Sequence, residues 1–241
     1  MILHVKNIVK SFEEKNIIDN VDFMLQPASI TAIAGRNGSG KTTILKMMAG
    51  ILDCDEGCIL IDEKNLKYFP KLKENIAYLS DRFNFFDFEK VSQVIEYYEI
   101  IYPKFDKEFV IREFNEIGIS LDDRIRSFSK GSNSLVGLIL ILATNAQFVL
   151  VDEILDGMDV LNKEKIIGLL IEAADKGKSI LVSSHELEEL EGLADRIIYL
   201  SLDGKIREVE SMGQSNLIKI QRVCKDSFPK DLENSLVLRQ N

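Results

Sequence analysis

Apolar and polar residues alternate along the first part of the chain in the manner of short β-strands. The pattern runs from residue 2 to residue 23 and is broken by Asn and Asp at turn-like positions. The next apolar run, at residues 29–34, ends at a glycine and is also typical of a strand. Residues 42–50 then have helical character and stop at a second glycine. We predict a strand-rich N-terminal segment that leads into a strand, a loop and a helix.

The middle of the chain changes from strand-like to helical patterning. Residues 59–61 and 76–79 predict further strands, whereas residues from about 82 to 130 have amphipathic helical spacing. We therefore predict a helical insertion over about 82–130. Its aromatic residues at helical spacing are typical of a packed core, and a docking surface for another protein is the alternative. These residues are Phe83, Phe85, Phe86, Phe88, Tyr97, Tyr98, Tyr102, Phe105, Phe109 and Phe114.

Helices and strands alternate in the last part of the chain. The pattern predicts helices at 134–144, 163–176 and 186–194 and strands at 148–151, 179–183 and 196–200. Strands that alternate with helices form a largely parallel sheet covered by helices on both faces. We predict an α/β fold in which one domain covers residues 1–205, begins with an antiparallel β subdomain and carries the helical insertion. Residues 206–241 are expected to form a short C-terminal appendage or tail.

Charge and hydropathy limit the partners of this chain. Its formal net charge of −9 argues against nucleic acid, because phosphate backbones are bound by clustered Lys and Arg. The basic residues are scattered, so no patch for anionic lipids is predicted. The longest apolar stretch, residues 135–143, is far shorter than the roughly 20 residues that span a bilayer, and the N-terminus lacks the apolar core of a signal peptide. We expect a cytoplasmic protein that meets a membrane only through a protein partner.

The three cysteines give a weaker signal. Cys54 and Cys58 are four residues apart and could form half of a metal site, but a zinc site needs about four ligands, and His4 and His185 are far from them in the sequence. We favour two ordinary thiols near a turn. Cys224 makes the cysteine count odd, which fits a reducing compartment.

A phosphate-binding loop joins the predicted strand at 29–34 to the following helix. The pattern G-x-x-x-x-G-K-[ST] is matched by Gly35, Gly40, Lys41 and Thr42. Its glycines let backbone N–H groups surround phosphates, and the helix N-terminus favours their negative charge. Lys41 can reach the outer phosphates, and the Thr42 hydroxyl can bind Mg²⁺. We expect a P-loop NTPase core that binds ATP and Mg²⁺. The expected nucleotide contacts are Gly35, Arg36, Asn37, Gly38, Ser39, Gly40, Lys41, Thr42 and Thr43.

Two acidic residues follow the predicted buried strand at 148–151. Asp152 and Glu153 would lie at the carboxyl end of this strand, where ligands bind in open parallel sheets. We expect Asp152 to hold Mg²⁺ through water and Glu153 to orient the attacking water as a catalytic residue. A solvated polar strand end is the alternative.

The motifs and their order over roughly residues 1–205 resemble the ATP-binding-cassette family of transport ATPases. In that family a short signature motif precedes the magnesium-binding strand, and residues 128–132 (FSKGS) stand in its place here. Ser129 and Gly131 match the motif, and the resemblance implies that they bind the γ-phosphate of a nucleotide held by a second chain. The lysine between them is similar to the SKG form in ATPases of Gram-positive bacterial multidrug and antibiotic-peptide exporters.

Four further residues match or replace functional positions of the family. The resemblance implies that Asp159 belongs to the loop after the acidic strand and that His185 contacts the γ-phosphate, so His185 joins Glu153 and Lys41 as a catalytic residue. It also implies that Phe12 stacks on adenine, with a place in the core as the alternative. Asp81 stands where the family has a glutamine that touches the metal. It is a candidate Mg²⁺ ligand, or a plain loop acid.

The resemblance implies the ATPase subunit of an exporter. It would form a homo- or heterodimer and drive a separate transmembrane permease. A cassette that binds ATP only to associate with partners is an alternative, because the signature helix lacks the usual glutamine and basic residue. A small-molecule P-loop kinase is disfavoured by the signature, the loop at Asp159 and His185. Selectivity for the transported substrate is expected to lie in the membrane partner.

Overall fold

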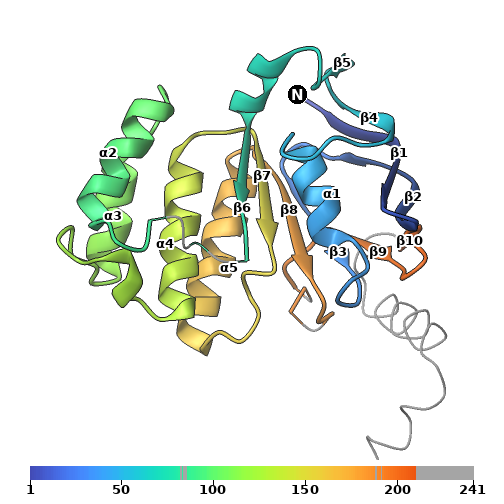
Figure 1. Cartoon of the computed structure of the whole chain (residues 1–241). Helices are drawn as coiled ribbons and strands as arrows, with labels where there is room; N and C mark the ends of the chain where they lie inside the picture. The colour runs from blue at the N-terminus through green and yellow to red at the C-terminus, as the bar shows by residue number, and fades with distance from the viewer. Residues whose placement is uncertain (82, 84–85, 188, 191, 210–241) are drawn as a thin grey trace, which may run out of the picture.

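The computed structural model describes residues 1–209 except 82, 84–85, 188 and 191. Two β-sheets enclose one helix, and further helices cover the outer face of the larger sheet (Figure 1). This arrangement is the predicted α/β fold with an antiparallel subdomain and a helical insertion. Among the described residues, none of the helices combines the length and apolar character that a membrane crossing requires.

The smaller sheet is antiparallel and holds the predicted N-terminal strands. It contains β1 (Leu3–Phe12), β2 (Lys15–Leu25), β4 (Glu56–Ile61) and β5 (Lys64–Asn65) in the order β2-β1-β4-β5. Val21, Phe23 and Leu25 of β2 are buried at alternating positions, which is the period of a strand with one face in the core. The strands at 59–61 and 2–23 are thereby confirmed.

The larger sheet is parallel except at one edge. Its order is β10-β9-β3-β8-β7-β6, and only β10 runs antiparallel to its neighbour. The central strands are buried at every position, and their middle residues are apolar, as expected for strands covered on both faces. The bounds are β3 (Ser29–Ala34), β6 (Ile76–Leu79), β7 (Phe148–Asp152), β8 (Ser179–Ser184), β9 (Arg196–Leu200) and β10 (Ile206–Val209).

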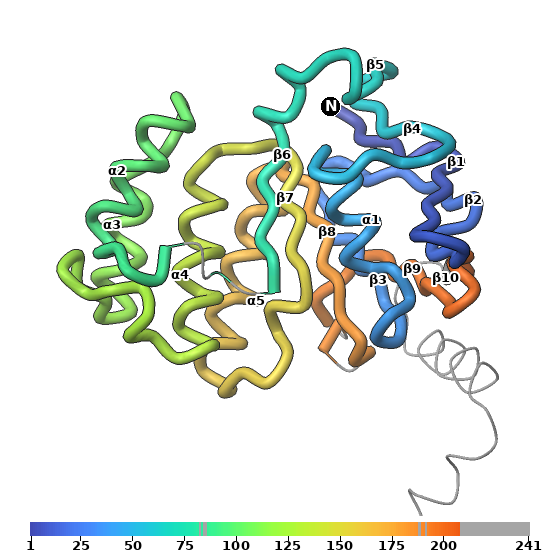
Figure 2. Tube along the Cα trace, in the orientation of Figure 1, coloured from blue at the N-terminus to red at the C-terminus, as the bar shows by residue number. Residues whose placement is uncertain are grey.

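The helices divide the core into two parts. Helix α1 (Lys41–Met48) lies between the two sheets, whereas α4 (Lys130–Ala143) and α5 (Val160–Asp175) pack on the other face of the larger sheet. Successive residues of a strand contribute to the two parts of the core in turn. Leu150 packs toward α1, and its neighbours Val149 and Val151 pack toward α4 and α5. Figure 2 shows α2 (Val91–Ile101) and α3 (Lys107–Glu116) beyond α4. Short 3-10 helices occur at Pro70–Asn75 and Ile125–Ser127.

The aromatic residues of the insertion are mostly core. Phe83 and Phe114 are buried, and Phe86, Tyr98, Phe105 and Phe109 pack partly buried against the same cluster. Tyr102 stacks on Tyr98. Phe88 and Tyr97 are exposed. Phe85 lies outside the described residues.

Two helices begin earlier than predicted, at positions where a side chain caps the helix N-terminus. The helix predicted at 134–144 begins at Lys130 because Ser129 accepts a hydrogen bond from the backbone of Ser132. The helix predicted at 163–176 begins at Val160 because Asp159 caps it in the same way. Hydroxyl and carboxylate caps satisfy backbone N–H groups that have no partner within the helix.

One helix predicted near the C-terminal end is wrong. The described residues of the segment 186–194 form turns and bends rather than the expected helix, with hydrogen bonds from Leu190 to Leu187 and from Leu193 to Leu190. Gly192 there adopts a positive φ of 76°, which a helix cannot contain. The larger sheet continues to Val209, because β10 pairs with β9. Residues 210–241 of the expected tail, including Cys224, lie outside the described residues.

Candidate functional site

The loop between β3 and α1 depends on its glycines. A Cβ atom on Gly35 would lie 2.5 Å from the Leu200 carbonyl oxygen. Gly38 and Gly40 have positive φ values of 82° and 103°, which other residues rarely adopt. The glycines therefore permit a tight turn between β3 and the N-terminus of α1.

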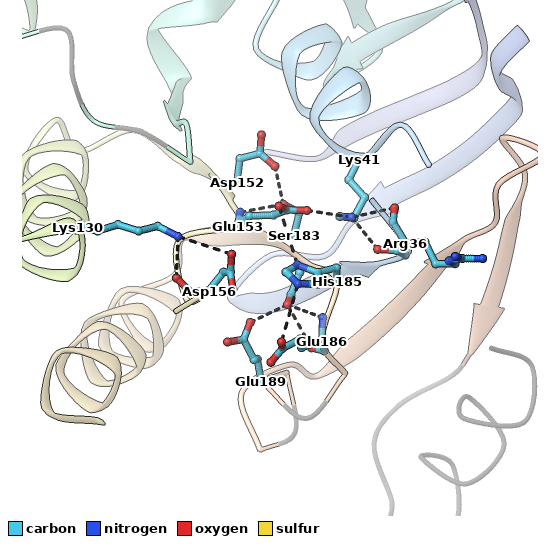
Figure 3. Close-up of polar contacts among 12 residues, drawn as sticks. Arg36, Lys41, Lys130, Asp152, Glu153, Asp156, Ser183, His185, Glu186 and Glu189 are labelled. Atoms are coloured by element: carbon cyan, nitrogen blue, oxygen red, sulfur yellow. Dashed lines mark hydrogen bonds and ion pairs between the residues drawn. The ribbon is translucent and has the colours of Figure 1, made fainter. Parts of the chain in front are cut away.

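Lys41 opens α1 with a side chain that is only 4% exposed. Its ammonium group donates hydrogen bonds to the carbonyl oxygens of Gly35 at 2.6 Å and Arg36 at 3.2 Å. It also forms an ion pair with Glu153 Oε1 at 2.9 Å (Figure 3). Burial and these contacts hold the positive charge at the end of the loop.

Asp152 is the last residue of β7 and is almost completely buried. Its Oδ1 accepts a hydrogen bond from Ser183 Oγ at 2.6 Å, and its Oδ2 accepts one from the Tyr78 hydroxyl at 3.2 Å. Burial, followed by the charge of Asp152, raises the pKa of Tyr78, so this hydroxyl remains a donor at neutral pH. The carboxylate is therefore held by donors from both neighbouring strands, β6 and β8.

Glu153 lies between two cationic or titratable groups. One carboxylate oxygen pairs with Lys41, and the other is 4.0 Å from His185 Nδ1. Its backbone N–H donates to both oxygens of Ser183, the carbonyl at 3.2 Å and the hydroxyl at 3.0 Å. Its φ of 47° is unusual for a residue with a side chain, and such strain costs about 1–3 kcal/mol. The surrounding hydrogen bonds thus fix Glu153 in a conformation that it would not adopt alone.

His185 follows β8, and its Nδ1 atom is buried without a hydrogen-bond partner. Its backbone is fixed by the residues on either side. Ser184 Oγ donates to Glu189 Oε2 at 2.7 Å and accepts a hydrogen bond from the Glu186 N–H at 3.0 Å. Glu189 is itself buried and pairs with Lys163 of α5 at 3.1 Å. The His185 imidazole approaches the Glu153 carboxylate oxygen that does not pair with Lys41.

An open pocket of about 350 Å³ lies in front of the glycine loop. It is lined by Phe12, Ile17, Asn37, Gly38, Gly40, Lys41, Thr42, Thr43 and Glu153. Phe12 is 47% exposed there, and the Lys10 ammonium group stands 5.5 Å from its ring centre. The structure thus brings most of the predicted loop contacts together with Phe12. Because the Phe12 side chain is exposed, it does not belong to the core, which was the alternative for this residue.

Ser129, Gly131 and Asp159 form a second group that does not line this pocket. A Cβ atom on Gly131 would lie 3.1 Å from Asn162 Nδ2 and 3.4 Å from Asp159 Oδ2, so the start of α4 packs closely on the start of α5. Hydrogen bonds from the backbone and then the side chain of Asn162 lower the pKa of Asp159. The predicted signature residues therefore lie outside the pocket in front of the glycine loop of their own chain.

Asp81 is exposed and follows β6. Its charge contributes to the raised pKa of Tyr78, which places it in the electrostatic neighbourhood of Asp152. Sequence reasoning did not single out Tyr78, Ser183 or Ser184, because their roles arise from contacts between strands rather than from a motif.

The residues present fit a bound triphosphate and Mg²⁺. Ser39 Oγ and His185 Nδ1 are buried polar atoms without a hydrogen-bond partner among the described residues, and such atoms are usually satisfied by a ligand or water. The exposed Thr42 hydroxyl and the Asp152 carboxylate are hard oxygen donors of the kind that Mg²⁺ prefers.

The cysteine metal site considered from the sequence receives no support. Cys54 and Cys58 are free thiols, and burial is the main cause that raises the pKa of Cys54. Within the described part of the chain, the group with metal-ligand spacing is instead Asp156, His185 and Glu186, whose ligand atoms lie within 4.8 Å of one another.

Comparison with known proteins gives a consistent result. A family model described as ABC transporter matches residues 18–156. The ABC transporter ATP-binding protein YtrB of Bacillus subtilis is 31% identical, over 91% of this chain and 76% of YtrB. The lipopolysaccharide export system ATP-binding protein LptB of Haemophilus influenzae is 27% identical, over 85% of this chain and 88% of its own length. The ribose import ATP-binding protein RbsA of Bacillus subtilis is 24% identical, over 91% of this chain and 47% of RbsA.

Solved structures share the fold. A dimeric bacterial ABC transporter cassette superposes with a TM-score of 0.76 at 23% identity, over 88% of this chain and 100% of that chain.

Proposed function

The chain belongs to the ABC transporter family and is an ATPase subunit, and we propose that it couples ATP hydrolysis in a two-chain cassette to a separate transmembrane permease. The observation that carries the proposal is the position of Glu153. Its carboxylate lies between the buried ammonium group of Lys41 and the unpartnered Nδ1 of His185, beside the glycine loop.

We assign the residues of this site by their chemistry. The glycine-loop N–H groups and Lys41 bind the β- and γ-phosphates. Glu153 orients the attacking water, and His185 contacts the γ-phosphate. Phe12 stacks on the base, because its ring is exposed at the rim of the pocket.

We assign the Mg²⁺ site to Thr42 and Asp152, with Asp81 as a further candidate. When bound, Mg²⁺ neutralises charge on the phosphates. Both Asp152 oxygens already accept hydrogen bonds from Ser183 and Tyr78, which leaves them oriented to accept a further bond from a metal-bound water.

The partner assignment follows from the second group of residues. Ser129, Gly131 and Asp159 lie outside the nucleotide pocket of their own chain, so a second cassette would bring them to a phosphate. Ser129 caps α4, and this helix end offers N–H groups to an anion. Two chains would thus complete two sites, either as a homodimer or as a heterodimer.

We propose export as the direction of transport. The lysine in the signature segment resembles that of exporter ATPases, and the relative LptB carries an export name, although RbsA carries an import name. Co-purification of the membrane partner from detergent and transport into inside-out vesicles test the direction. ATP-dependent accumulation of substrate in such vesicles is expected for an exporter, and its loss from preloaded inside-out vesicles would show import.

Phosphate release by the purified chain tests the catalytic assignment. Wild type should release phosphate from ATP, and Glu153→Gln should reduce the rate at least about 100-fold because the water loses its carboxylate partner. Nucleotide binding, followed with a fluorescent ATP analogue, should persist in Glu153→Gln. Glu164→Gln, which alters an exposed acid of α5, is the matched control. Equal rates in wild type and Glu153→Gln would contradict the assignment.

A further inference from the structure

The signature segment carries a lysine whose contacts lie within its own chain. Lys130 Nζ donates a hydrogen bond to the backbone oxygen of Asp156 at 2.9 Å and lies 3.6 Å from its Oδ2. Figure 3 shows this side chain reaching from the start of α4 to the loop between β7 and α5. The start of α4 is therefore attached to that loop through Lys130.

The opposite end of the same loop also contacts the signature segment. Gly131 packs against Asp159 and Asn162, at the start of α5. The segment 129–131 is thus held at both ends of the loop 156–159. A displacement of this loop has to move Ser129 or break one of the two contacts.

The loop is directly connected to the hydrolysis site. Glu153 pairs with Lys41, and the two residues that follow it, Ile154 and Leu155, are buried in the core. Close-packed residues transmit displacement rather than absorb it. Asp156 also has a ligand atom within 4.8 Å of those of His185 and Glu186. A change at Glu153 or His185 therefore reaches Asp156 over a short packed path.

We propose that Lys130 is a positioning residue that couples the phosphate site of its own chain to the signature segment offered to the partner chain. The inference rests on the proposed two-chain cassette. When phosphate displaces Glu153 from Lys41, the loop at Asp156 shifts, and Lys130 carries the shift to Ser129. Occupation of one site then changes the affinity of the other, which is a coupling free energy between sites.

The ATP dependence of phosphate release tests this coupling. Wild type should show a Hill coefficient above 1. Lys130→Met should lower it toward 1 and raise the ATP midpoint about two- to fivefold, the range that an exposed ion pair supports. Asp156→Asn should give a smaller shift because the contact to the backbone oxygen remains, and Lys130→Arg should retain wild-type behaviour.

Two controls separate coupling from general damage. Lys176→Met removes another exposed ion pair, to Glu172 at 2.5 Å, and should leave the Hill coefficient unchanged. ATP affinity of the monomer is measured in a Ser129→Arg background, which the proposed dimer cannot accept, and Lys130→Met should not alter it. The double variant Lys130→Met/Asp156→Asn should behave like Lys130→Met, because the two residues act through one contact.

Each outcome has a defined meaning. A wild-type Hill coefficient of 1, or wild-type values in Lys130→Met, overturns the coupling and leaves the proposed ATPase intact. An equal loss of monomer ATP affinity in Lys130→Met also overturns it. Absence of phosphate release by wild type overturns the proposed function and this inference with it.

Discussion

At the scale of single residues, Asp152 owes its orientation to two hydroxyl groups from neighbouring strands. Ser183 and Tyr78 each donate to one of its oxygens, and a buried carboxylate without such donors would carry an uncompensated charge. The orientation of an acid that holds a metal through water depends on these partners as much as on the acid itself.

Removal of one donor should weaken metal binding without disturbing the fold. Tyr78→Phe is expected to raise the Mg²⁺ concentration for half-maximal ATPase activity about fivefold, which corresponds to about 1 kcal/mol for one hydrogen bond. Tyr102→Phe makes the same chemical change in the helical insertion and should have no effect on the Mg²⁺ midpoint. A Tyr78→Phe midpoint equal to that of wild type would show that this hydroxyl does not act on the metal site.

Sequence reasoning located Asp152 and Glu153 but not the residues that hold them. The acids follow an apolar run, which is a local pattern. Ser183 reaches Asp152 because β8 lies beside β7, and Tyr78 reaches it because β6 lies on the other side. Which strands are neighbours depends on contacts across the whole chain, and no local spacing near Tyr78 or Ser183 indicates it.

At the scale of elements, α4 is buried at every position from Ser134 to Ala143. Gly137 lies where a Cβ atom would approach Leu79 Cδ1 to 2.8 Å and Phe83 Cγ to 2.9 Å. The glycine therefore allows α4 to lie close to β6 and the start of the insertion. Gly168 of α5 has no atom within 4 Å of such a Cβ.

These two glycines allow a matched comparison. Gly168→Ala should raise the free energy of unfolding by about 0.5–1 kcal/mol, because alanine is the better helix former. Gly137→Ala gains the same propensity but overpacks the core, and we expect it to lower the free energy of unfolding by about 1–2 kcal/mol. Urea unfolding followed by circular dichroism measures both. Stabilisation by Gly137→Ala would mean that Phe83 can move aside at no cost.

The misplaced helix and the misplaced helix starts all depend on hydrogen bonds or ion pairs of polar side chains. Residues 186–194 have amphipathic helical spacing, yet their described part forms turns. The Glu189 side chain accepts a hydrogen bond from Ser184 and pairs with Lys163. A short helix is only marginally stable by itself, so these tertiary contacts decide the conformation of the segment. Helix starts were likewise set by the side-chain caps of Ser129 and Asp159, which periodicity alone does not reveal.

At the scale of the whole molecule, the residues proposed to bind the nucleotide and the proposed signature residues form two separate groups. The glycine loop and Glu153 line one pocket, and Ser129 and Gly131 lie outside it. An alternating strand and helix pattern predicted the parallel sheet, but not the strand order that separates these parts or the return of β10 onto its edge.

A charge at the second surface should block association of two chains. Ser129→Arg, placed in a Glu153→Gln chain that retains ATP, is expected to abolish the ATP-dependent dimer in light scattering. Binding of the fluorescent ATP analogue to the monomer should be unchanged, because Ser129 does not line the pocket. Ser127→Arg, two residues earlier, is the control for charge alone. Persistence of the dimer in the Ser129→Arg chain would show that this segment is not at the interface.

The ion pair between Lys41 and Glu153 has a consequence for how phosphate enters. The carboxylate is an anion built into the chain, and the fold holds it 2.9 Å from the lysine that a nucleotide needs. It is therefore an intramolecular competitor, present at a high effective concentration that no dilution can reduce. On the proposed function, the phosphates of an incoming nucleotide have to displace this carboxylate before they reach the Lys41 ammonium group.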